Sequence, residues 1–198
     1  KHNSRTKGEA AYTSVLRQLG MKTSLEWTPQ PSHDENARFE QLLERGGTKR
    51  GAPVVVLYAA EATAHTGWPV EKFAELAAQF VALFGARIAV ADIPADSGFT
   101  NAVADLLPAD AIELKAPAAT ELLAALARAS LVVTDDAGVA RFSARLGTPT
   151  VDLGSHPAKE MHGAPAGVPG RLDATTEDVF VVASELLQKS RTATLFRR

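Results

Sequence analysis

Two adjacent carboxylates follow an apolar run in the stretch TDDAGVARFSARLGTPTVDLG, residues 134–154. Asp136 is followed by Ala137 and Gly138, two small residues that let a ligand approach the backbone at the start of a helix-like segment. The free amides of a helix's first turn, together with the helix dipole, favour anions, so this stretch could hold a diphosphate. The simpler interpretation of Asp136 is a helix cap, and Asp135 has the same alternative.

Two arginines lie on the helix-like segment behind these carboxylates. Arg141 and Arg145 are four residues apart and therefore share one helix face, from which they could reach a phosphate at the second turn. The alternative is that both belong to a solvated face. We take Arg141 as the better candidate.

Two further loops follow β-rich runs. Residues 59–68 come after PVVVLY, and residues 93–98, which carry Asp96, come after RIAVAD. Trp68, at the end of the first loop, is interpreted as a packing anchor and not as a platform for a base. His65 in the same loop could donate to a phosphate.

From residue 53 onward, short β-rich runs alternate with amphipathic segments. We expect strands over 53–58, 87–92, 111–114, 130–135 and 149–153, and helices over 69–84, 96–107, 118–128, 137–146 and 176–188. Such alternation predicts an α/β fold: a Rossmann-like, mainly parallel sheet with helices on both faces. In such a sheet, ligands bind beyond the carboxyl ends of the strands, where the loops 59–68, 93–98 and 135–138 all lie.

The chain before residue 51 has a different pattern. It holds a helix-like stretch over 8–19, the extended KTSLEWTPQP, and a polar helix over 34–45. These pieces cannot close a second core. We interpret 1–50 as the remnant of an N-terminal domain with its linker and 51–198 as the ligand-binding domain. The alternative is an extension that wraps over the main sheet.

Composition narrows the classes of partner and compartment. The 198 residues are 45% hydrophobic with a formal charge of -2, so we expect a globular protein and no nucleic-acid partner. The chain has no cysteine, which excludes disulfides and fits a reducing, cytoplasmic compartment. We expect no transmembrane segment because each apolar run is interrupted by polar residues. The histidines are too scattered for a metal site, and we expect neither metal nor cofactor.

On these residues the chain resembles the C-terminal, donor-binding domain of glycosyltransferase family 9, the ADP-heptose:lipopolysaccharide heptosyltransferases, which have the two-domain GT-B fold. The family's K-x-W-P helix start is similar to HTGWPVEKFAELA, with Trp68, Pro69 and Phe73 in place. The family's D-[ST]-G-x-x-H-x-A-x-A-x-G-x-P is similar to DAGVARFSARLGTP at the same spacing. LGSHPA occupies the place of a family F-G-x-t-x-P loop, with Gly154 and Pro157 in place.

Three donor-site positions depart from the family pattern. Thr66 stands in place of the motif lysine, Ala137 in place of the hydroxyl residue and Arg141 in place of the histidine. The resemblance implies that the lysine and the hydroxyl contact donor phosphates, so their loss should weaken donor binding. The family's catalytic aspartate belongs to the N-terminal domain, and no residue here inherits that role. The donor-binding set implied in this chain is Thr66, Asp96, Asp136, Ala137, Gly138 and Arg141.

The resemblance implies an inverting transfer of a sugar from a nucleotide-sugar donor, ADP-linked by family likeness, to a lipid-linked saccharide acceptor such as lipopolysaccharide. It also implies peripheral association with the inner membrane face, through an acceptor bound by the N-terminal domain. One alternative is a decayed GT-B-like domain that serves as a binding or scaffold module. A nucleotide-sugar epimerase is weaker because its D-S-G-G motif is not reproduced, and a response-regulator receiver carries its acidic pair after a different strand.

Overall fold

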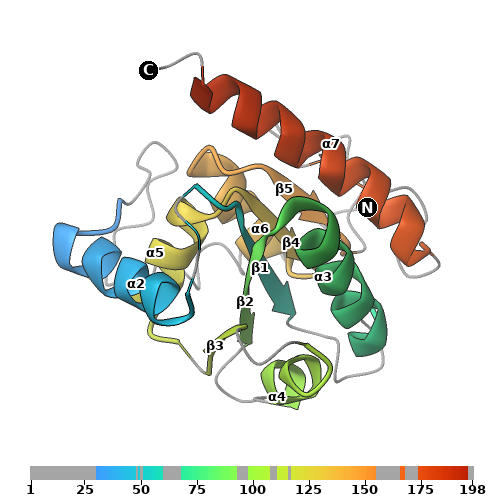
Figure 1. Ribbon diagram of the computed structural model, residues 1–198, viewed down its shortest axis with the longest axis horizontal. Coiled ribbons are helices and arrows are strands. Elements are labelled where there is room, and N and C mark those ends of the chain that lie inside the picture. Colours follow the sequence, from blue (N-terminus) through green and yellow to red (C-terminus); the bar gives the residue numbers. More distant parts are fainter. Residues whose placement is uncertain are drawn as a thin grey trace, which may run out of the picture.

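The structure is a computed structural model that describes residues 30–47, 49, 51–59, 68–92, 98–107, 111–115, 117–154, 166–167 and 174–195 (Figure 1). In this part of the chain, the strands form one parallel sheet in the order β3-β2-β1-β4-β5-β6. Their bounds are Val54–Ala59 (β1), Arg87–Asp92 (β2), Ile112–Leu114 (β3), Leu131–Thr134 (β4), Thr150–Asp152 (β5) and Ala166–Gly167 (β6). The parallel sheet predicted from the sequence is confirmed, and the two-residue β6 is an addition to it.

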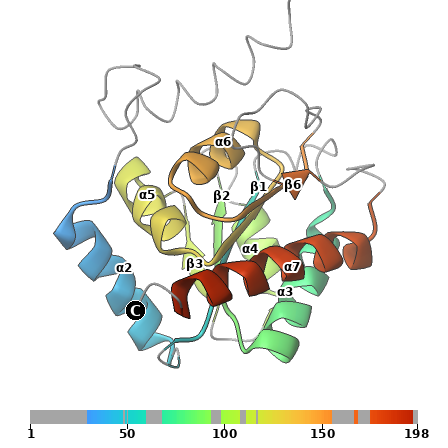
Figure 2. The same ribbon diagram turned by 90° about the horizontal axis from the view of Figure 1, so that it is seen from above.

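Helices cover both faces of this sheet. Their bounds are His33–Arg45 (α2), Val70–Phe84 (α3), Gly98–Ala104 (α4), Ala119–Arg128 (α5), Ala137–Arg145 (α6) and Thr176–Leu195 (α7). Val55 and Leu57 of β1 point into the core layer under α3, α4 and α7, and Val54 and Val56 point into the layer under α2, α5 and α6. Figure 2 shows these two groups of helices on opposite sides of the strands.

The local sequence of α3 determines its buried face and its end. Its buried Phe73, Leu76, Ala77 and Phe80 recur at helical spacing and form one apolar face against the sheet. The helix ends at Gly85, which adopts a left-handed φ of 58° that favours glycine. The helix expected from the sequence over 69–84 is thus confirmed, with its end at Phe84.

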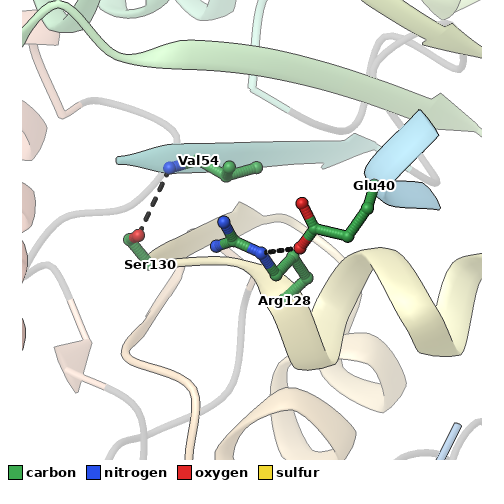
Figure 3. A network of polar contacts seen from close by, with 4 residues as sticks. All are labelled: Glu40, Val54, Arg128 and Ser130. Atoms are coloured by element: carbon green, nitrogen blue, oxygen red, sulfur yellow. Dashed lines mark hydrogen bonds and ion pairs between the residues drawn. The ribbon is translucent and has the colours of Figure 1, made fainter. Parts of the chain in front are cut away.

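The helix α2 lies in the stretch assigned from the sequence to the linker, and it packs on α5. Phe39 and Leu43 are buried in the same core layer as α5. Figure 3 shows Arg128 Nε of α5 donating to Glu40 Oε1 of α2, and next to this pair Val54 N donates 3.2 Å to Ser130 Oγ. Since the ion pair is partly exposed, the two buried side chains contribute most of the attachment of α2.

The start of α7 is fixed by a reciprocal pair. Asp178 N donates 3.1 Å to Thr175 Oγ1, while Thr175 Oγ1 and Thr175 N donate 2.7 and 3.1 Å to Asp178 Oδ2. The hydrogen bond from the Thr175 side chain, followed by the one from its backbone, lowers the pKa of Asp178 below its ordinary value of 3.8. The helix then runs to residue 195, beyond the end at 188 expected from the sequence.

Among the helices that the structure describes, none combines the length and the apolar character that a bilayer-spanning segment requires.

Candidate functional site

The strand order places a topological switch point between β1 and β4. From β1 the chain moves outward to β2 and β3, and from β4 it moves the other way to β5. Tyr58 and Thr134 are paired near the carboxyl ends of the two central strands. The helix α3 leaves β1 on one face of the sheet, and α6 leaves β4 on the other. The first turns of both helices therefore flank the switch point, the usual ligand-binding position in an open parallel sheet.

The entrance to α6 is built around Asp136. Its Oδ1 accepts a 2.7 Å hydrogen bond from Val139 N, and Thr134 Oγ1 accepts a 3.0 Å hydrogen bond from Asp136 N. The cap interpretation of Asp136 is thus confirmed. The first amides of a helix have no partner within the helix, and Asp136 accepts the one from Val139. The amides of Ala137 and Gly138 belong to the same turn, whose side chains are buried and small.

Arg141 lies one turn into α6 and is half-buried, whereas Arg145 is exposed. Residues four apart share a helix face, so Arg141 follows Ala137 on that face. Side chains on a helix lean toward its N-terminus. Arg141 is therefore the arginine closer to the α6 entrance, while Arg145 is one turn further away.

Two buried aspartates and a pair of hydrogen bonds lie where β4 and β5 end. Gly154 N donates 2.8 Å to Asp152 Oδ1, and Leu153 N donates 2.7 Å to the carbonyl of Thr134. Asp135 and Asp152 are both buried at this edge. Sequence reasoning did not single out Asp152. Its signal was an aspartate two residues before a glycine at a strand end, the spacing of an Asx-type turn.

A side chain at Gly154 would collide with this turn. A Cβ built there lies 2.6 Å from the carbonyl oxygen of Asp135 and 3.0 Å from Asp152 Oδ1. The backbone just after β5 therefore passes close to the turn that leads into α6. Glycine is needed here for space, and the closeness couples the two strand ends.

Four of the six candidate donor-binding residues meet at one place, the entrance and first turn of α6: Asp136, Ala137, Gly138 and Arg141. The other two, Thr66 and Asp96, lie outside the described residues. Trp68, two residues after Thr66 in the sequence, is fully buried, which confirms it as a packing anchor. Within the described ranges, no three acidic or histidine side chains gather as a metal site would require.

We expect Asp136→Ala to lower the free energy of unfolding by about 0.5–2 kcal/mol, because the substitution leaves Val139 N without its acceptor at the helix start. Asp136→Asn keeps an acceptor oxygen and should lose much less. Denaturant midpoints of the two variants and the parent measure the difference. Equal midpoints for Asp136→Ala and the parent would show that the cap adds nothing to stability.

A family model described as glycosyltransferase family 9 (heptosyltransferase) matches residues 11–165, which include the whole α6 entrance. No curated protein matches the sequence significantly. The solved structures with a similar fold share little sequence with this chain. A glycosyl transferase family 9 structure from Veillonella parvula has a TM-score of 0.70 and 20% identity, covering 89% of this chain and 58% of the other.

Two more structures extend the likeness. The Escherichia coli ADP-heptose lps heptosyltransferase II has a TM-score of 0.63 and 19% identity, over 86% of this chain and 56% of that one. The Methanocaldococcus jannaschii UDP-GlcNAc 2-epimerase, in complex with UDP-GlcNAc and UDP, has a TM-score of 0.59 and 15% identity, over 93% and 47%. These likenesses show a GT-B type fold, and the chain spans less than two thirds of each structure.

Proposed function

The chain belongs to glycosyltransferase family 9, and from that premise we propose that it carries the donor-binding half of a heptosyltransferase-type enzyme. The observation that supports this most is the α6 entrance. A capped helix start with two small residues flanks the β1–β4 switch point, within the region that the family model matches. Such an entrance suits a nucleotide diphosphate, because first-turn amides and the helix dipole both favour anions.

In the proposed reaction, an acceptor hydroxyl attacks the anomeric carbon with inversion, its proton passes to a base of the acceptor-binding domain, and the bond from the sugar to the nucleoside diphosphate breaks. The departing diphosphate gains negative charge as the glycosidic bond breaks. The amides at the start of α6 and the guanidinium of Arg141 would stabilise that charge more strongly in the transition state than in the ground state. We assign these groups to donor binding and place no catalytic base among the 198 residues.

The donor is proposed to be ADP-linked, since the family model is that of heptosyltransferases and one similar structure is named for ADP-heptose. We propose that residues 1–50 are the end of an acceptor-binding domain with its linker, and 51–198 the nucleotide-sugar domain. The acceptor would be a lipid-linked saccharide, and the enzyme would act in the cytoplasm, peripherally at the inner membrane face.

We expect calorimetric titration to detect weak binding of ADP, and Arg141→Ala to weaken it roughly tenfold or more through loss of a charge-assisted contact. Arg145→Ala is the matched control, because it removes the same charge one turn further from the entrance. Arg141→His, which restores the family residue, should retain part of the affinity. All three variants should unfold at nearly the parent's denaturant midpoint.

The second candidate function is a decayed GT-B-like module that no longer transfers sugar. It is favoured by Ala137, which stands where the family has a hydroxyl residue, at the position where a phosphate contact is implied. The same titration separates the two functions. No heat at millimolar ADP or UDP would support the decayed module, and tighter binding of UDP than of ADP would point to the donor class of the epimerase.

A further inference from the structure

Three hydrogen bonds tie the start of α3 to the start of α7, although the bonded residues are about a hundred positions apart. Trp68 Nε1 donates 3.2 Å and Lys72 Nζ donates 2.8 Å to the carbonyl oxygen of Ala174. Thr176 Oγ1 donates 2.6 Å to Glu75 Oε2. We call these five residues the α3–α7 clamp. Both views place the two helices side by side (Figures 1 and 2).

The positions of the three side chains explain how the start of α3 holds all three bonds. Lys72 and Glu75 are three positions apart on α3 and share one face, and Trp68 lies just before the N-cap Pro69. The ammonium of Lys72 also lies 5.9 Å from the centre of the Trp68 ring, within the range of a cation–π contact. One side of α3 is thus dedicated to the start of α7.

Aromatic packing holds the indole ring of Trp68 in place. Trp68 is fully buried, and its ring meets Phe73 edge-on at 5.0 Å. Phe73 in turn meets Phe99 edge-on at 5.0 Å, and Phe99 lies in the first turn of α4. The column of three rings therefore joins the beginnings of α3 and α4, and the indole N–H extends the connection to α7.

The clamp sits at the functional edge of the sheet. The helices α3 and α4 follow β1 and β2, so their first turns lie at the carboxyl ends of those strands. The first turn of α3 flanks the β1–β4 switch point from the face opposite α6. A shift of that turn would change the distance between the starts of α3 and α6, where the proposed diphosphate binds.

We propose that Trp68 and Lys72 are positioning residues for nucleotide binding. By fixing the first turn of α3 to the Ala174 carbonyl, they set the distance between the starts of α3 and α6 before a ligand arrives. The inference rests on the proposed function, since it needs a nucleotide at this edge. Ala174 is buried, and both side chains donate to its carbonyl oxygen. Removing both donors therefore deletes two hydrogen bonds to a buried acceptor, which is costly.

The experiment compares Trp68→Phe, Lys72→Met and the double variant. Phenylalanine keeps an aromatic ring in the buried site and removes only the indole N–H with part of the ring system, and methionine keeps the length of the lysine stem. The control is Phe84→Leu, which loosens the contact of α3 with Phe180 of α7 at the far end of α3. Hydrogen exchange of the first turn of α7 reports on the clamp, and calorimetry with ADP reports on the site.

In the double variant we expect faster exchange at the amides of Val179 and its neighbours, and ADP affinity lowered by roughly tenfold, the effect of losing an ordinary binding contact. Each single variant should show part of both effects. Phe84→Leu should lower the denaturant midpoint and leave ADP affinity at the parent's value. This contrast separates positioning from a general loss of stability.

Two results would overturn the positioning role. One is a double variant that binds ADP as the parent does although exchange at the start of α7 has risen. The other is unchanged exchange, which would show that the bonds do not hold the helix. A parent chain that gives no heat with ADP would instead refute the proposed function, and the positioning role with it.

Discussion

Replacing Phe73 by alanine is expected to lower the free energy of unfolding by about 3–5 kcal/mol, the range for removal of a buried phenylalanine ring. The ring is fully buried and is the middle member of the column Trp68–Phe73–Phe99. Its removal deletes two edge-on aromatic contacts and leaves a cavity between the starts of α3 and α4. Urea denaturation followed by far-ultraviolet circular dichroism measures the change.

The matched control is Leu83→Ala on the same helix. Leu83 is 68% exposed, so its truncation should change the free energy of unfolding by no more than about 0.5 kcal/mol. A small domain is stable by only about 5–15 kcal/mol, and Phe73→Leu provides a milder variant if the alanine protein does not fold. A loss below about 1 kcal/mol for Phe73→Ala would mean that the core closes over the missing ring.

Much of the fold could be predicted because its signals are local. The parallel strands are apolar on both faces and read as continuous runs such as VVVLY, while the helices repeat at 3.6 residues. The strand Arg87–Asp92 has the predicted bounds, and α3 ends at Phe84 as expected. The strand β6 was not predicted, because a strand of two residues shows no periodicity in the sequence. The attachment of α2 to α5 depends on buried contacts between distant positions, which no local pattern records.

In the candidate site, too, local features could be predicted from the sequence and long-range contacts could not. Asp136 was readable as a cap because capping is decided within four residues. Asp152 and the Ala174 carbonyl were not, because their importance comes from partners on other elements. The role of the donor-binding residues is a different kind of inference. It comes from family membership, and only ligand binding can test it.

We expect Gly154→Ala to lower the free energy of unfolding by about 1–3 kcal/mol, the usual cost of forcing a side chain into a filled site. The new methyl carbon would lie 2.6 Å from the carbonyl oxygen of Asp135, so one of the two strand ends must move. Because Asp135 directly precedes the cap Asp136, the movement should also displace the α6 entrance. Denaturant midpoints and ADP affinity should therefore fall together in this variant.

Gly147 is the control that identifies the physical cause. It has a left-handed φ of 81° and open space around it, so Gly147→Ala costs backbone strain of about 1–2 kcal/mol without a collision. Asparagine tolerates left-handed backbone better than alanine does, so Gly147→Asn should recover stability. At Gly154 the order should reverse, with asparagine worse than alanine because it is larger. If asparagine is better tolerated than alanine at Gly154, then backbone conformation and not the contact with Asp135 determines the need for glycine there.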